Sequence, residues 1–536
     1  MNLNISNINS YFQNFTSRSK KNKISNSQPT NNISQSSNLS QIKQDTFELS
    51  IGYVNDLHGQ TNNMMRILSG IKGDLKLSAG DNDIGDEKNA TIHKATSKFL
   101  NIADIKASAL GNHELDTTQK DCINSLNEFN GDMLSVNYRK IPLNRQHNDD
   151  IKKNGRAELD KHLKHSTVVE IKGEQIGIIG ASPIDMFERL THPNYYLDSY
   201  IKDLEDTIYD IKDEIRILKE QGINKIILLS HLGNKRDRII AQTVNDIDVI
   251  IGGHSHELIK NIKKDKNLFF NKNGEPTIIT QAGRDGNYFG NLNLEFDKNG
   301  IIIKAQNNIG DTGLFHKNMI NEYIFNKILG TPENVGYVKF APAHPNTLIE
   351  ENPHANFVCD IMRKETDSDI ALWQNAGVRN YFHEGIINTS DIKDMAPFFD
   401  YVVIANVSEK KIVNLLKSTI ENSYKSSAKK PGLIATSGLE YTIDTKNGKL
   451  IGANFVDKNG NLQKINIDNP SETKTYKIVA DEFLMSAGAD FPVLATEDEY
   501  IKQYEYDKDY LVCEYLKKNK EPIVINHTGR IHFINE

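Results

Sequence analysis

Short apolar runs recur along the first part of the chain, separated by polar stretches. The runs at 49–54, 75–79 and 105–110 have the length of buried strands, and those at 225–229 and 248–251 are similar. A helical pattern at 204–218 precedes the run at 225–229. This alternation of strands and helices predicts a layered α/β domain.

The clearest helix covers residues 204–218. Its apolar positions repeat at alternating steps of four and three, at Leu204, Ile208, Ile211, Ile215 and Leu218. Charged residues occupy the other faces, and Gly222 follows where a C-terminal cap belongs. Before this helix, the segments 168–171 and 175–180 predict a hairpin that turns at 172–173.

The pattern changes after residue 257. Short strands are expected there, with turns at 273–274 and 299–300. A helical stretch over 318–329 follows, and then a strand near 336–341. The region after the second turn therefore begins a new group of elements.

These patterns divide the chain into four parts. Residues 1–46 are rich in Asn, Ser, Gln and Lys and lack an apolar run, so they bury too little surface to offset the entropy of ordering. We expect them to form a disordered tail. We also expect a layered domain over 47–315, a linker or hinge over 316–350, and a second domain over 351–536.

Residue types that bind metals stand at the ends of five expected strands. The five segments hold carboxylates, imidazoles and an amide: Asp56-Leu57-His58, Gly80-Asp81, Gly111-Asn112-His113-Glu114, His231, and Gly253-His254-Ser255-His256. Ligands of open α/β sheets collect on the loops at strand ends. One such segment would be weak support, but five in this arrangement predict a site for two metal ions.

The expected donors are a mixture of nitrogen and oxygen. Imidazole and carboxylate together suit zinc or manganese, and also cobalt or iron, whereas magnesium and calcium prefer oxygen donors. Two such ions activate a water molecule and neutralise phosphate charge. The expected chemistry is therefore the hydrolysis of a phosphoester.

Charge and hydropathy exclude other classes of function. The net charge of −7 argues against nucleic-acid binding, which usually requires a basic surface. No stretch approaches the ~20 apolar residues of a membrane-spanning segment. The first residues lack the apolar core of a secretory signal, so the sequence favours a cytoplasmic location. We expect a monomer.

With these motifs the chain resembles the calcineurin-like metallophosphoesterases, and more closely the 5′-nucleotidase family, over about residues 47–530. The resemblance implies a four-layer α-β-β-α sandwich followed by a smaller α+β C-terminal domain that binds substrate. Members are mostly periplasmic or secreted, so export by a route other than a classical signal stays open.

The resemblance also implies metal ligands. Those of the first ion are Asp56 and His58, with His256 as a further ligand, and those of the second ion are Asn112, His231 and His254. Asp81 would bridge the two ions.

Three residues near Asn112 have implied roles beside the metals. His113 would stabilise charge that develops on the phosphoryl group or the leaving oxygen, and Asp116 would orient it. Glu114 is expected to be structural.

Loops in the second half imply a nucleotide substrate. The segment 375–379 resembles the family's Asn-to-Arg loop, although it is one residue shorter. In the family this arginine binds phosphate and two aromatic rings enclose the base. The implied substrate-binding residues are Asn375, Arg379, Phe398 and Phe491.

The expected reaction is hydrolysis of a nucleoside monophosphate to nucleoside and phosphate, as in 5′-nucleotidases. A 2′,3′-cyclic-nucleotide phosphodiesterase/3′-nucleotidase and a UDP-sugar or dinucleotide pyrophosphatase stay open, because all of them use the same attacking water. The related thiosulfohydrolases are disfavoured because their substrate has no base. A non-catalytic nucleotide-binding protein is disfavoured because every ligand position is filled.

Overall fold

The computed structural model describes residues 46–84, 90–141, 159–190, 196–271, 274–342, 348–426, 431–486, 491–519 and 521–535. The tail expected at 1–46 lies outside these ranges apart from residue 46, and so does the first residue of the turn expected at 273–274. Within the described ranges, no helix combines the length and apolar character needed to cross a lipid bilayer.

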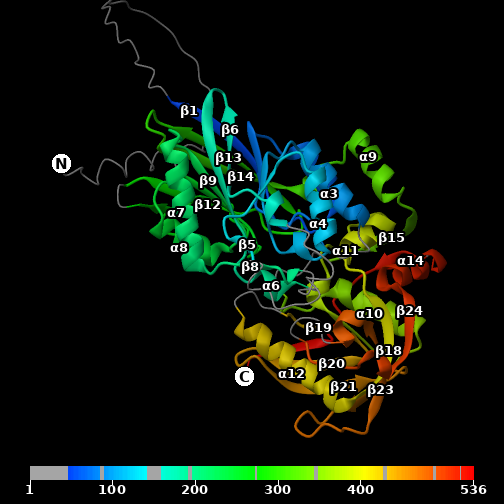
Figure 1. Ribbon diagram of the computed structural model, residues 1–536. Helices are drawn as coiled ribbons and strands as arrows, with labels where there is room; N and C mark the ends of the chain where they lie inside the picture. Colours follow the sequence, from blue (N-terminus) through cyan, green and yellow to red (C-terminus); the bar gives the residue numbers. More distant parts are fainter. Residues whose placement is uncertain are drawn as a thin grey trace, which may run out of the picture. The chain divides into compact units, whose positions relative to one another are not determined.

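Two sheets form the centre of the first half (Figure 1). The first sheet has the order β14 (Ile302–Asp311), β13 (Tyr288–Phe296), β1 (Phe47–Val54), β2 (Leu75–Ser78), β3 (Ala107–Ala109) and β4 (Asp132–Leu134). The second has the order β11 (Leu268–Phe270), β12 (Pro276–Thr280), β10 (Val249–Gly252), β9 (Ile226–Ser230), β7 (Glu174–Ala181) and β6 (Ser166–Ile171).

The strands in the middle of each sheet are parallel. In the first sheet β1, β2, β3 and β4 pair in parallel, and in the second sheet β7, β9, β10 and β12 do so. Their carboxyl ends therefore lie along the same edge of each sheet. The hairpin expected around 172–173 is confirmed as β6 and β7, which are antiparallel.

Apolar side chains fill the space between the sheets and beneath the helices. Ile51 and Leu77 of the first sheet pack in one core with Ile178, Leu229 and Val249 of the second. Helices α2 (Thr61–Gly70) and α3 (Ala90–Ile102) cover the outer face of the first sheet, and α7 (Leu204–Glu220) and α8 (Asn234–Thr243) cover the second (Figure 1). The four-layer sandwich is thus confirmed.

Local chemistry explains where these elements begin and end. The side chain of Asp203 caps α7 by accepting from the amide of Asp206. Of the expected apolar stripe, Ile211, Ile215 and Leu218 are buried against the second sheet. The apolar run at 105–110 is only partly strand, because the amide of Ile105 donates to Leu100 O (2.9 Å) and closes the end of α3.

The second half contains three smaller sheets. One has the order β19 (Ile434–Ser437), β16 (Ile370–Gln374), β23 (Thr475–Asp481), β18 (Tyr401–Ser408) and β24 (Tyr500–Asp507). The others have the orders β17 (Gly385–Asn388), β15 (Asn334–Phe340), β25 (Ile523–Val524), and β22 (Leu462–Lys464), β21 (Lys449–Val456), β20 (Leu439–Asp444), β26 (Ile531–Ile534).

Helices cover both faces of the central sheet of the second half. Its helices are α10 (Pro353–Glu365), α11 (Thr389–Met395), α12 (Glu409–Lys425), α13 (Glu482–Met485) and α14 (Lys508–Lys518). Residues of α10 and α14 share a core with Trp373, and α12 packs on the opposite face. This arrangement confirms the α+β character expected for the second half.

The remaining elements connect or flank these layers. They include β5 (Tyr138–Lys140), which pairs with β8 (Ser199–Ile201), and α4 (Gln119–Glu128), α6 (Met186–Arg189) and α9 (Met319–Leu329). Phe325 of α9 packs in the first half, whereas β15 pairs with strands of the second half. The chain therefore passes from one half to the other between α9 and β15.

Candidate active site

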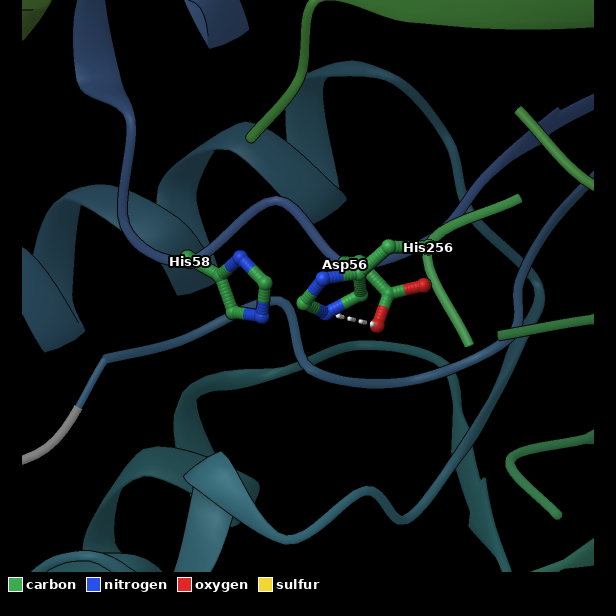
Figure 2. Close-up of side chains that lie close together, drawn as sticks. All are labelled: Asp56, His58 and His256. Atoms are coloured by element: carbon green, nitrogen blue, oxygen red, sulfur yellow. Dashed lines mark ion pairs between the residues drawn. The ribbon is translucent and has the colours of Figure 1, made fainter. Parts of the chain in front are cut away.

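Residues of the five predicted segments meet at the carboxyl ends of the parallel strands. Three groups of side chains each have ligand atoms within 4.8 Å of one another: Asp56, His58 and His256; His58, Asp81 and His113; and Asp81, His231 and His254. Neighbouring groups share His58 and Asp81. Figure 2 shows the first group, with the imidazole of His256 beside the carboxylate of Asp56.

Backbone hydrogen bonds align the loops that carry these side chains. The amide of Asp56 donates to Gly80 O (2.9 Å), and the amide of His58 donates to Asp81 O (3.0 Å). The amide of His254 donates to the carboxylate of Asp56 (3.0 and 3.1 Å). Loops that follow β1, β2 and β10 are therefore fixed to one another.

The backbone is strained where the ligand residues lie. The φ angles are +48° at Asp56, +47° at His58, +51° at Asp81, +69° at His254 and +58° at His256. A left-handed conformation costs a residue with a Cβ about 1–3 kcal/mol and persists only where the surrounding structure imposes it. The fold therefore stabilises the left-handed backbone at these candidate ligand positions.

The two central carboxylates are anionic. Burial by itself raises the pKa of Asp56, but the charge of His256 and its hydrogen bond lower it more, to about 2. Asp81 is also buried, yet the charges of His231 and His113 hold its pKa well below the usual range. Buried anionic carboxylates of this kind require a cation beside them.

Two imidazoles have the nitrogen that a metal requires. Nδ1 of His58 donates to Asp285 Oδ1 (2.8 Å), and Nδ1 of His231 donates to Ala79 O (2.6 Å). Nε2 of each ring is buried and directed at Asp81 Oδ2, which lies 3.6 Å from Nε2 of His58 and 2.9 Å from Nε2 of His231. The donors present therefore fit divalent metal ions.

The neighbouring carboxylate favours the protonated form of His231. Burial lowers the pKa of His231 while the charge of Asp81 raises it, and the net value is about 10. A metal ion that binds Nε2 of His231 therefore displaces a proton.

The residues expected around the second ion also lie together. His231 and His254 belong to the same group as Asp81. Asn112 Oδ1 is 3.1 Å from Nδ1 of His254, and Nε2 of His254 is 3.3 Å from Asp185 Oδ1. The side-chain oxygen of Asn112 therefore lies beside the imidazole of His254, and both were expected to bind the second ion.

His113 and Asp116 form the expected pair. Asp116 Oδ2 hydrogen bonds to Nδ1 of His113, and the amide of His113 donates to Asp81 Oδ1 (2.8 Å). Burial lowers the pKa of His113, but Asp116 and Asp81 raise it more. The ring is therefore suited to hold a proton, and Nε2 is the nitrogen that Asp116 leaves available.

Glu114 joins two of the loops. Its buried carboxylate accepts from the amides of Asn82 (2.7 Å), Gly111 (2.8 Å) and Asp81 (3.2 Å). Burial, together with the charge of Asp81, raises the pKa of Glu114 to about 7. The contacts agree with the structural part expected for this residue.

Two of the expected substrate residues lie beside the three groups of carboxylates and imidazoles that could hold metal ions, which we call the metal-capable groups. Arg379 Nη1 is 3.7 Å from Asp285 Oδ1 and 3.4 Å from Nδ1 of His58. The guanidinium carbon lies 5.0 Å from the centroid of the Phe398 ring. Both residues belong to the second half, so this half contributes directly to the site.

The other two expected substrate residues have structural contacts. The side-chain amide of Asn375 donates to Leu348 O (3.2 Å) and Glu350 O (2.8 Å). Phe491 is 6% exposed and packs in a core of the second half, with its ring centroid 6.2 Å from that of Phe483. Residues 487–490 of the same loop lie outside the described ranges, and substrate binding by Asn375 and Phe491 stays a prediction.

Sequence reasoning missed two carboxylates that contact ligand histidines. Asp285 pairs with His58, and Asp185 pairs with His254. Both follow apolar strands, β12 and β7, so the strand-end signal that selected the other residues also applied to them. Partners of this kind orient a histidine ligand and select its tautomer.

Comparison with known families gives two matches along the chain. Residues 49–258 match the calcineurin-like phosphoesterases, and residues 330–496 match the 5′-nucleotidase C-terminal domain.

Similar proteins carry names of the same kind. The trifunctional nucleotide phosphoesterase protein YfkN of Bacillus subtilis is 23% identical over 92% of this chain, which spans only 35% of that relative. The 5′-nucleotidase of Diplobatis ommata is 26% identical over 84% of this chain and 81% of its own length. The structure of a 5′-nucleotidase precursor from Thermus thermophilus is 22% identical, covers 91% of this chain and all of its own (100%), and has a TM-score of 0.68.

Proposed function

This chain belongs to the 5′-nucleotidase family of calcineurin-like metallophosphoesterases, and on that premise we propose that it hydrolyses 5′-nucleoside monophosphates to nucleoside and phosphate. One observation carries the proposal most directly. Three neighbouring carboxylate–imidazole groups are linked through His58 and Asp81, and the buried Nε2 atoms of His58 and His231 are directed at the carboxylate of Asp81. An arginine and an aromatic ring lie beside these groups, as a phosphate and a base require.

We propose that the site holds two divalent ions, zinc or manganese. The residues that would hold the first are Asp56, His58, His256 and Asp81, and those that would hold the second are Asp81, Asn112, His231 and His254. When bound, the ions would supply an activated water and neutralise phosphate charge.

The protein's own side chains perform the remaining work in this proposal. Asp116 holds Nδ1 of His113, so that the protonated ring donates from Nε2 to the leaving oxygen. Arg379 binds the phosphate oxygens, and the ring of Phe398 stacks on the base. Burial of Arg379 and of the carboxylates strengthens these interactions by excluding water.

An assay with several substrates tests the proposal and separates its alternatives. Purified protein with added Mn²⁺ or Zn²⁺ is given AMP, 3′-AMP, cyclic 2′,3′-AMP, UDP-glucose and NAD. Fastest turnover is expected with AMP. Fastest turnover of the cyclic nucleotide, of UDP-glucose or of NAD would instead favour a phosphodiesterase or a pyrophosphatase, and no turnover of any would refute hydrolysis.

We also propose that the two halves are separate domains with a hinge within residues 316–350. The expected metal ligands come from the first half, whereas Arg379 and Phe398 come from the second. Substrate held by both groups must therefore enter and leave as the halves move apart.

A further inference from the structure

A single buried carboxylate contacts both a metal-capable histidine and the arginine of the second half. It belongs to Asp285, which is 1% exposed and lies on the loop between β12 and β13. Its Oδ1 accepts a hydrogen bond from Nδ1 of His58 (2.8 Å) and lies 3.7 Å from Arg379 Nη1. Its Oδ2 is 3.2 Å from Nε of the neighbouring Arg284.

The contact with His58 determines which nitrogen of the ring can bind a metal. Because Nδ1 donates its proton to Asp285, the lone pair is on Nε2. That nitrogen is buried, lacks a hydrogen bond and lies 3.6 Å from Asp81 Oδ2. The carboxylate of Asp285 also fixes the rotation of the ring, so Nε2 stays directed at the shared centre.

The contact with Arg379 supplies a counter-charge. The Arg379 side chain is 12% exposed, and its Nε is buried without a hydrogen-bond partner. Among the residues that the structure describes, Asp285 is the one carboxylate within ion-pair distance of this guanidinium. A buried cation needs such a partner, and the partner determines where the cation lies.

The backbone holds Asp285 where it can make both contacts. Its amide donates to Asp56 O (2.6 Å), and its carbonyl accepts from the side chain of Asn63 (2.9 Å). Its φ is +56°, in the left-handed region that Asp, Asn and Gly tolerate best. The position is therefore fixed by the loop of a metal-capable residue and by α2.

We propose that Asp285 is a positioning residue that aligns His58 with the first metal ion and Arg379 with the substrate phosphate. The proposal rests on the proposed function, because it assigns Asp285 to the same site. It adds that the metal site and the phosphate site are coupled through one carboxylate.

The metal arm of the test compares three variants of the full chain. Asp285→Gly removes the carboxylate, and Asp285→Asn keeps an oxygen that accepts from His58 but removes the charge; both tolerate the left-handed backbone. Asp265→Asn is the control, since Asp265 also has a positive φ (+60°) but is exposed and lies on another loop.

Metal-stripped protein is titrated with Mn²⁺ in a calorimeter. Asp285→Gly should weaken the tighter-binding step ~10–100-fold, whereas Asp285→Asn and the control should stay within about threefold of wild type. Wild-type affinity in Asp285→Gly, with circular dichroism confirming the fold, would overturn the assignment to His58.

The phosphate arm measures inorganic phosphate binding to the manganese-loaded protein. Asp285→Asn should weaken phosphate binding by about tenfold, because the unanchored arginine must be ordered on binding. In an Arg379→Ala background the same substitution should have little effect, since the two residues act together. An equal loss in both backgrounds would overturn the link to Arg379.

Failure of this proposal is distinguishable from failure of the proposed function. Both arms measure binding, so they judge Asp285 even if no nucleotide in the assay panel is hydrolysed. In a protein that hydrolyses AMP, unchanged Mn²⁺ affinity of Asp285→Gly together with unchanged phosphate affinity of Asp285→Asn would reject the coupling and leave the hydrolase intact.

Discussion

At the scale of one residue, the side chain of Asp81 takes part in several contacts of the site at once. It belongs to two of the three metal-capable groups, and it also accepts the amide of His113. The left-handed backbone that aims it at the centre is a conformation that most residues avoid. Loss of this carboxylate therefore removes a metal-capable side chain from both groups and a hydrogen-bond partner from the backbone of His113.

The first prediction concerns metal content. Asp81→Ala should lose both ions, because it removes the shared carboxylate, whereas His256→Ala should lose only the ion of the first group. Elemental analysis of the purified variants after metal loading measures the difference. His527→Ala, at an exposed position, is the control, and full metal content in Asp81→Ala would contradict the shared site.

The second prediction separates chemistry from metal binding. His113→Ala should lower kcat ~10²–10⁴-fold, the usual contribution of a positioned proton donor, with metal content unchanged. Asp116→Asn should lower kcat less, because the ring stays in place but loses the carboxylate that holds Nδ1. Metal loss in His113→Ala would show instead that the imidazole is a ligand.

At the scale of elements, polar contacts join α2 of the first half to α11 of the second. The amide of Asn62 donates to Asp394 Oδ2 (3.2 Å), and the side chain of Gln60 donates to Asp394 O (2.8 Å). Asp394 is 4% exposed. Burial, with the charge of Asp391, raises the pKa of Asp394 to about 7, although Lys317 and Asn62 act in the opposite direction.

The third prediction is a pH dependence of stability. In the unfolded chain the pKa of an aspartate is ≈ 3.9, so between this pH and pH 7 the folded state binds more protons than the unfolded state. The free energy of unfolding therefore falls as the pH rises towards 7. Asp394→Asn retains a neutral acceptor and should therefore gain thermal stability relative to wild type between pH 5 and pH 8. Melting curves at both pH values measure this.

The control is Asp203→Asn, which makes the same substitution at the exposed N-cap of α7, away from the α2–α11 contact. An equal stability difference at pH 5 and pH 8 for Asp394→Asn would contradict its assignment as the responsible group.

At the scale of the whole molecule, side chains of the second half contact residues around the metal-capable groups of the first half. Asn62 Nδ2 lies 3.1 Å from Ser390 Oγ, and Arg379 reaches the pair formed by His58 and Asp285. If substrate is held between the metal-capable groups and Arg379, as proposed, product release requires the halves to move apart. Turnover should therefore depend on movement between the halves.

The fourth prediction tests that movement. A disulfide between Asn62→Cys and Ser390→Cys should hold α2 against α11 and lower kcat at least ~10-fold, because release becomes rate-limiting. A reductant should restore activity, and each single cysteine variant should be insensitive to it. Full turnover by the oxidised double variant would refute the requirement for opening.

Local patterns were sufficient for much of the fold and for most candidate ligands. The helix 204–220 follows from its apolar spacing, and Asp56, Asp81, His231 and His254 could be selected because each follows an apolar run. Such signals depend only on residues close in the chain. They apply equally to Asp185 and Asp285, but the partners of these carboxylates are distant, as His58 is from Asp285.

The amino-acid sequence by itself determined the main strands of the first half, the helix that begins at Leu204, the layered class of fold and the residue types at the strand ends, because periodicity and strand-end chemistry are local. Tertiary structure alone decided which strand ends meet, since β13 pairs with β1 although the two are far apart in the chain. That pairing places Asp285 on His58, and the contact between the halves adds Arg379. Phe491, by contrast, packs in a core that no local pattern distinguishes from a binding surface.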